Sequence, residues 1–152
     1  MKKTSNPFEE LLVGLVDAGV TFVTVGGIAC AFNGYVRATE DVDVLVKRNP
    51  ENIRKLLQFL SSYGEGYGAE LQDADFSEEE GAVRVIEEFP IDIFVLMSGR
   101  RFEDFESQIK TIELEGRLIP YLSREALIAL KADSLREKDK MDVVQLKALK
   151  SP

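Results

Sequence analysis

The sequence has no histidine, no tryptophan and a single cysteine, and it has no apolar run of about 18 residues, the length that indicates a membrane-spanning helix. The absence of histidine excludes zinc sites built on imidazole and acid–base catalysis by an imidazole. One cysteine cannot form an internal disulfide, which fits a reducing compartment. The first residues lack the apolar core of a signal peptide. We therefore expect a cytoplasmic protein without a membrane partner.

Basic residues are also scarce relative to acidic ones. The chain has 19 lysine and arginine residues against 27 aspartate and glutamate residues, which gives a net charge of −8 at pH 7. Such a surface repels polyanions, so long nucleic acid is not an expected partner. A length of 152 residues with 45% hydrophobic residues is typical of one globular domain. We expect one domain over residues 1–152, with a core over about 5–121 and C-terminal helices over about 123–150; an oligomer is compatible with this.

Start and stop signals divide the chain into helices and strands. Asn-Pro pairs at 6–7 and 49–50 predict helix starts, because asparagine caps the first turn and proline fits the first helical position. Apolar and β-branched runs predict the strands. Four expected helices begin at 7, 28, 50 and 124, and a fifth covers about 139–150. The expected strands are 20–25, 41–46, 83–86 and 91–96, with a hairpin over 110–121. This order predicts an α/β (α+β) fold in which a small mixed β-sheet packs against helices and the C-terminal end is helical.

Two features have both a functional and a plain interpretation. The stretch 63–81 loses any periodic pattern and is rich in glycine and acidic residues, so it is either a mobile loop over a site or a solvated connector. The pattern favours the connector. Cys30 lies on the short helix after 28 and is either a reactive thiol or a small core residue; its apolar neighbours favour the core.

Alternating aspartates and valines over 41–46 predict a metal site. The period of two places Asp41 and Asp43 on one face of the expected strand, with the valines on the other face. Two ionised carboxylates roughly 7 Å apart along a strand repel each other unless water or a cation lies between them. Mg²⁺ is usually held by one or two carboxylates together with substrate phosphates.

Two further features fit a phosphate-bearing ligand. Gly26 and Gly27 follow a strand and precede a helix, a position where free backbone N–H groups accept phosphate. Asp92 lies inside a strongly apolar strand, where a carboxylate is costly unless it is paired, hydrogen-bonded or bound to metal. We expect the three carboxylates to converge on one site, on neighbouring strands, with the glycine pair at the same end of the sheet.

The order of these residues resembles the nucleotidyltransferase superfamily of DNA polymerase beta, and within it the minimal bacterial branch of antitoxin-type and antibiotic-modifying nucleotidyltransferases. RATEDVD at 37–43 is similar to the Arg-x-Thr-x-Asp-apolar-Asp signature of that branch. LIALK at 127–131 and KDKMD at 138–142 resemble its C-terminal helical segment. The resemblance spans roughly residues 5 to 150.

The resemblance implies a catalytic role for the three acids. Asp41 and Asp43 would bind two Mg²⁺ ions, and Asp92 would complete one site and help to deprotonate an attacking hydroxyl, as in two-metal displacement at phosphorus. The substrate would be an NTP, and the acceptor is not written in the sequence.

The resemblance also implies a nucleotide-binding set. Gly26 and Gly27 would cradle the triphosphate, although the family often has serine at the second position and Gly27 offers no hydroxyl. Arg37 and Lys131 either neutralise the leaving pyrophosphate or form ordinary ion pairs, and Thr39 either orients a carboxylate or caps the turn.

The sequence leaves three functions open. The preferred one is Mg²⁺-dependent transfer of a nucleoside monophosphate from an NTP to a hydroxyl of a protein, an RNA end or a small molecule. The second is a non-catalytic, antitoxin-like or regulatory module that binds a partner protein. The third, an acid-cluster phosphohydrolase, leaves the glycine pair unexplained.

Overall fold

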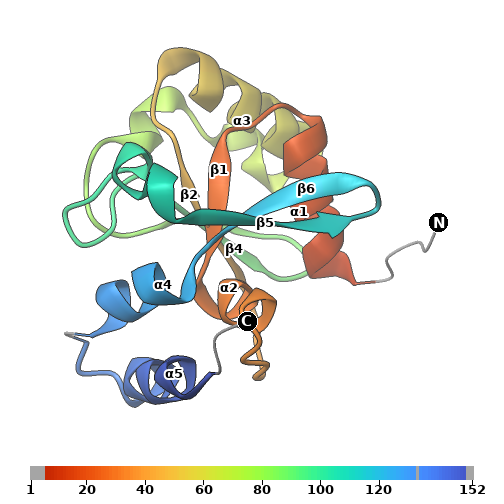
Figure 1. Ribbon diagram of the computed structural model, residues 1–152. Helices are drawn as coiled ribbons and strands as arrows, with labels where there is room; N and C mark the ends of the chain where they lie inside the picture. Colours follow the sequence, from red (N-terminus) through yellow and green to blue (C-terminus); the bar gives the residue numbers. More distant parts are fainter. Residues whose placement is uncertain (1–5, 133, 150–152) are drawn as a thin grey trace.

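The computed structural model describes residues 6–132 and 134–149 of the chain. Figure 1 shows a β-sheet with helices on both sides and a helical C-terminal end. The strands are β1 (Phe22–Val25), β2 (Val42–Val46), β3 (Val83–Ile86), β4 (Pro90–Phe94), β5 (Ile109–Leu114) and β6 (Arg117–Leu122). The α-helices are α1 (Pro7–Asp17), α2 (Gly26–Phe32), α3 (Pro50–Ser62), α4 (Arg124–Lys131) and α5 (Glu137–Ala148), and the 3-10 helices are η1 (Tyr67–Glu70), η2 (Asp73–Phe76) and η3 (Phe102–Gln108).

The six strands form one mixed sheet in the order β3-β4-β2-β1-β6-β5. β2 pairs antiparallel with β1 and parallel with β4, while β6 pairs parallel with β1. The hairpins β3–β4 and β5–β6 complete the two edges. The predicted α/β fold with a mixed sheet is confirmed.

Strand alternation divides the core between the two faces of the sheet. On one face the valines of β2, at 42, 44 and 46, pack with buried residues of α1 and α3. On the other face Val25 and Leu45 pack with buried residues of α2, α4 and α5. Figure 1 shows α4 and α5 as a pair beside α2, away from α1 and α3. The first face is the main core, and the second face carries the polar residues described below.

Both predicted helix starts are confirmed at the level of single hydrogen bonds. The Asn6 side chain accepts from the backbone N–H of Phe8 at 2.8 Å, and Pro7 is the first residue of α1. The Asn49 side chain accepts from the N–H of Asn52 at 2.7 Å. The predicted cap at Ser123 is present too, because its hydroxyl accepts from the N–H of Ala126.

Several boundaries differ from the predictions. The first strand begins at Phe22, two residues later than expected; just before it, the N–H of Thr21 donates to the Asn52 side chain, and the Thr21 carbonyl accepts from both the Asn52 side chain and the N–H of Lys47. Pro90 is the first residue of β4, where a missing N–H is tolerated. The last helix begins at Glu137, two residues earlier than expected, and Lys150, its expected end, lies outside the described residues.

The segment 63–81 is more ordered than a solvated connector. It contains η1 and η2, and Phe76 at the end of η2 is 1% exposed within the main core. The Arg48 side chain donates to the Phe76 carbonyl at 2.7 Å. The prediction of a solvated connector is therefore wrong at Phe76, an apolar residue whose acidic neighbours in the sequence gave no indication that it is buried.

Cys30 is a core residue. Its side chain is fully buried on the second face of the sheet, and burial raises the pKa of its thiol. A thiol held in the neutral form is a poor nucleophile. In the described part of the chain, every helix is too short or too polar to cross a membrane.

Candidate active site

Three carboxylates meet at one end of the neighbouring parallel strands β2 and β4. The parallel register of these strands sets Asp43 beside Asp92, and Asp41 immediately precedes β2. One oxygen of each carboxylate lies within 4.8 Å of the others. The expected convergence of Asp41, Asp43 and Asp92 is therefore what the structure shows, and it follows from strand parity together with the β2–β4 register.

Among the described residues, Asp43 is the member of the cluster that forms no ion pair, whereas Asp41 and Asp92 both lie beside Arg84. Its Oδ1 is buried and has no hydrogen-bond partner among the residues that the structure describes. Burial, followed by the nearby charges of Asp41 and Asp92, raises the pKa of Asp43 to about 7. A buried polar atom without a partner is rare and calls for an explanation such as a bound ion.

Arg84 is a site residue that the sequence did not reveal. It lies opposite Asp92 in the β3–β4 hairpin and binds it with two bonds, Nε to Oδ1 at 2.8 Å and Nη2 to Oδ2 at 2.9 Å. Its Nη2 also lies 3.7 Å from Oδ2 of Asp41. A signal was available: a carboxylate in an apolar strand needs a partner, and counting back through the hairpin places Arg84 opposite it.

Gly26 allows the Asp43 carboxylate to lie directly against the backbone. A Cβ at this position would lie 2.2 Å from Oδ2 of Asp43, and the φ angle of +67° is in the left-handed region. Because β1 and β2 are antiparallel, the end of β1 and the start of β2 coincide. The glycine pair is thus at the same end of the sheet as the three carboxylates.

The space beside Gly27 is filled by two polar side chains. A Cβ at Gly27 would lie 2.6 Å from Oγ1 of Thr39 and 3.0 Å from Nη1 of Arg37. Thr39 Oγ1 donates to the carbonyl of Arg37 at 3.3 Å, which corresponds to the turn-capping alternative. The volume that a serine side chain would need at position 27 therefore holds a hydroxyl from Thr39 instead.

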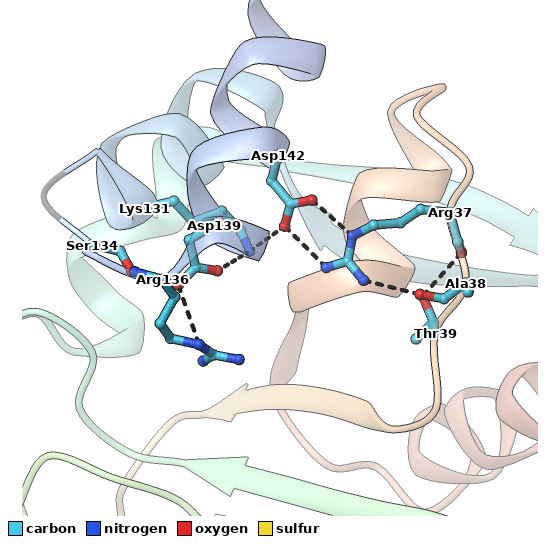
Figure 2. A network of polar contacts seen from close by, with 8 residues as sticks. All are labelled: Arg37, Ala38, Thr39, Lys131, Ser134, Arg136, Asp139 and Asp142. Atoms are coloured by element: carbon cyan, nitrogen blue, oxygen red, sulfur yellow. Dashed lines mark hydrogen bonds and ion pairs between the residues drawn. The ribbon is translucent and has the colours of Figure 1, made fainter.

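Arg37 and Lys131 converge on a fully buried carboxylate, Asp142 of α5. Figure 2 shows Asp142 between the two cations. Arg37 binds it through Nε at 2.7 Å and Nη2 at 3.0 Å, and Lys131 Nζ lies 2.8 Å from its Oδ2. Lys131 also binds Asp139 at 3.2 Å, and Ser134 donates to Asp139 at 2.7 Å.

This network, which we call the Asp142 clasp, consists of Arg37, Lys131 and Asp142. Burial by itself would raise the pKa of Asp142, but the hydrogen bonds from Arg37 and Lys131 outweigh it and lower the pKa. Both cations are less than 15% exposed. The ion-paired alternative for Arg37 and Lys131 is thus realised, and the pair still lines the cavity beside the carboxylates.

Two adjoining cavities lie over the carboxylate cluster. The first, of about 170 Å³, is charged and is bordered by the three aspartates, Gly26, Arg84 and Lys131. The second, of about 240 Å³, shares Gly26, Asp43 and Phe94 with the first but adds apolar side chains from Met97, Leu127 and Leu130. A charged compartment beside an apolar one suits a ligand with a phosphate part and a flatter apolar part.

Comparisons with known proteins address the family and the fold. A family model described as "Nucleotidyltransferase of unknown function (DUF6036)" matches residues 8–151. The structure is similar to that of the lincosamide antibiotic adenylyltransferase LnuA with lincomycin bound, at a TM-score of 0.66 and 18% identity, over 99% of this chain and 100% of that chain.

Two further solved structures are similar. One is an antigenic nucleotidyltransferase-like protein from Paracoccidioides brasiliensis, with a TM-score of 0.56 and 16% identity over 99% of this chain and 79% of that chain. The other is a putative nucleotidyltransferase from Thermotoga maritima, with a TM-score of 0.55 and 18% identity over 93% and 91%. No curated protein sequence matches the chain. At these identities the structural matches establish the fold.

Proposed function

The chain belongs to the family described as nucleotidyltransferase of unknown function, and from this premise we propose that it transfers a nucleoside monophosphate from an NTP to a hydroxyl acceptor with Mg²⁺ as cofactor. The observation that carries the proposal is the carboxylate cluster, in which Oδ1 of Asp43 has no hydrogen-bond partner among the residues that the structure describes. Three carboxylates whose ligand oxygens lie within 4.8 Å of one another form a hard oxygen donor set of the kind that Mg²⁺ prefers. The residues therefore fit the metal that the family implies.

The proposed reaction assigns a task to each of the three aspartates. Asp41 and Asp43 hold the cation, and Asp92 accepts the proton of the acceptor hydroxyl. The acceptor oxygen bonds to the α-phosphorus of the NTP, the bond between the α-phosphorus and the bridging oxygen breaks, and pyrophosphate leaves. Mg²⁺, as two ions in the nucleotide complex, supplies neutralisation of the charge that develops on the phosphates.

The remaining site residues bind and orient the nucleotide. Gly26 borders both cavities, and we assign the backbone of Gly26 and Gly27 to the triphosphate, with the Thr39 hydroxyl beside Gly27 in place of the one that Gly27 lacks. Arg37 and Lys131 direct positive charge into the charged cavity while the Asp142 clasp fixes their positions. Rigid positioning of this kind accounts for much of enzymatic phosphoryl transfer.

The acceptor is a protein, an RNA end or a small molecule. The lincomycin-bound adenylyltransferase has a fold that matches nearly the full length of both chains, so a small-molecule hydroxyl is included among the acceptors to be tried. The direct test incubates the purified protein and Mg²⁺ with each α-labelled NTP and with cell lysate, short RNA or lincomycin. We expect a labelled product that disappears in Asp43→Asn and persists in Asp17→Asn, a matched control on the exposed Arg117–Asp17 pair.

Asp92→Asn separates binding from chemistry in the same assay. Because the proton acceptor matters mainly in the transition state, we expect NTP–Mg²⁺ affinity within about tenfold of wild type and transfer reduced by at least about 10²-fold, the scale of a lost general base. Calorimetry measures the binding. Labelling that stays undiminished in Asp92→Asn would refute the role given to this residue.

A second candidate, the non-catalytic module, is favoured by one surface feature. Met141 and Val144, three residues apart on α5, are 52% and 60% exposed. A partner protein that binds there would be retained by Asp43→Asn and lost in a Met141→Ser, Val144→Ser double variant. Absence of both NTP binding at millimolar NTP and labelling would favour this module over the enzyme.

A further inference from the structure

Arg84 forms an ion pair with Asp92, one of the three carboxylates of the cluster. The guanidinium forms a two-bond fork with both oxygens of Asp92, at 2.8 and 2.9 Å. In this arrangement one acceptor site on each oxygen of Asp92 is engaged by an N–H donor. Asp43, in contrast, has no hydrogen-bond partner for its Oδ1 among the described residues. Within the described residues, the Asp92 carboxylate is therefore bound by Arg84, whereas Oδ1 of Asp43 has no such contact.

The contact is built into the sheet rather than being a chance surface pair. Arg84 and Asp92 are register partners in the β3–β4 hairpin, so their side chains project from the same face. The parallel β2–β4 register then continues the row to Asp43. Arg84 Nη2 also approaches Asp41, at 3.7 Å, from the same side. One guanidinium therefore reaches two of the three carboxylates.

Charge balance shows what the cluster can accept. Three carboxylates and the one guanidinium in contact with them leave a net charge of −2. Among the described residues, four more cations line the same cavity, namely Arg37, Lys131, Arg136 and Lys138, and the carboxylates of Asp139 and Asp142 offset only part of their charge. One divalent cation neutralises the cluster, while a second would give it a net positive charge unless phosphates were present.

We propose that Arg84 takes the place of the second cation when no nucleotide is bound, so that the free protein binds a single divalent ion between Asp41 and Asp43. This inference rests on the proposed function and deepens it. Triphosphate supplies the negative charge that allows a second ion, and Arg84 then exchanges Asp92 for a phosphate oxygen in the cavity that it borders. Arg84 is a positioning residue that sets metal stoichiometry.

The test titrates the full chain with Mn²⁺ alone, without nucleotide, and counts bound ions by calorimetry and by the electron paramagnetic resonance of free Mn²⁺. The wild-type protein should bind one ion. Arg84→Gln binds the first ion about tenfold more tightly, as expected when a unit charge about 5 Å from a divalent ion is removed in a watery dielectric, and it binds a second ion. The second ion is lost again in Arg84→Gln combined with Asp92→Asn.

Two further variants exclude simpler explanations. Arg117→Gln removes an equivalent two-bond arginine from the exposed Asp17 pair and leaves stoichiometry and affinity unchanged. Arg84→Lys keeps the charge but cannot engage both oxygens of Asp92 at once, so it binds the first ion with nearly wild-type affinity and, because the charge balance is unchanged, still excludes the second.

Two ions bound to wild type, or identical titrations for wild type and Arg84→Gln, would overturn the role of Arg84 and leave the proposed metal site standing. Absence of Mn²⁺ binding in every variant would overturn the proposed function as well.

Discussion

At the scale of single residues, the site is defined by Asp43 and the glycine against which it lies. The carboxylate is half-buried, has no hydrogen-bond partner for Oδ1 in the described part of the chain, and is repelled by its neighbours Asp41 and Asp92. Such an arrangement destabilises the metal-free protein and favours binding of a cation. Two substitutions test the two sides of this contact.

Asp43→Asn should stabilise the metal-free protein at alkaline pH. Because the folded-state pKa of Asp43 is raised to about 7, the stability that its proton contributes is complete below the unfolded pKa of about 4 and is lost as the pH rises through 7. At pH 8 with EDTA we expect a gain of about 1–3 kcal/mol, or several degrees in melting temperature; at pH 4 the gain should vanish. Calorimetric melts at both pH values measure it, and a lower melting temperature at pH 8 would mean that the carboxylate is structural.

Gly26→Ala should damage the site beyond its effect on the backbone. The added Cβ would lie 2.2 Å from Oδ2 of Asp43, so the carboxylate must move, and we expect Mn²⁺ affinity to fall at least about tenfold, the equivalent of about 1.4 kcal/mol. Gly99→Ala is the matched control, because its φ of +72° imposes similar backbone strain while nothing lies within 4 Å of the new Cβ. Equal metal affinities in the two variants, measured by calorimetry, would contradict the close-approach argument.

At the scale of elements, the Asp142 clasp connects α5 and α4 to the loop between α2 and β2. Arg37 lies in that loop, Lys131 is the last residue of α4, and Asp142 lies inside α5. The Arg37–Asp142 pair spans 105 residues of sequence. Because α5 makes its main packing contact with α4, the clasp is a polar connection that helps to hold the C-terminal helices against the site.

Asp142→Asn should loosen this connection. Removing one partner of a buried ionic cluster leaves two cations without a full counter-charge, and the expected cost is about 3 kcal/mol at pH 7. Since the clasp lowers the pKa of Asp142, its contribution is present above about pH 4 and declines as the pH falls through the lowered folded-state value. Urea unfolding at pH 7 and at pH 3 checks this, with Asp17→Asn of the exposed Arg117 pair expected to cost less than about 1 kcal/mol. Equal losses in the two variants would rule out a special role for the clasp.

The difference between what the sequence predicts and what it misses also lies at this scale. The helix starts at Asn6 and Asn49 and the parity of Asp41 and Asp43 depend on residues within one turn or one strand, so they can be deduced from the sequence. Arg84 and the Asp142 clasp depend on strand register and on contacts between distant segments. Phe76 was missed because burial of one aromatic ring leaves no periodic pattern. The metal and nucleotide roles of the site residues, and the single domain, stay predictions.

At the scale of the whole molecule, the net charge of −8 means that any added cation stabilises the fold to some extent by screening. A specific site must therefore be distinguished from a general salt effect. The carboxylate cluster provides the distinction, because a site saturates at one or two ions per chain and depends on particular residues, whereas screening depends on ionic strength alone.

Mg²⁺ should raise the melting temperature of the wild-type protein in a saturable way. At 100 times the dissociation constant, binding to the folded state alone adds about 2.7 kcal/mol, or about 5–10 °C for a chain of this size. The comparison solution contains Na⁺ at equal ionic strength, so that screening is matched. In Asp43→Asn the Mg²⁺ increment should disappear, because a neutral amide replaces the ionised carboxylate ligand, while Asp17→Asn should keep it. A Mg²⁺ increment that is equal in Asp43→Asn and wild type would show that the cation acts on the surface charge of the whole molecule, and the metal site would have to be abandoned.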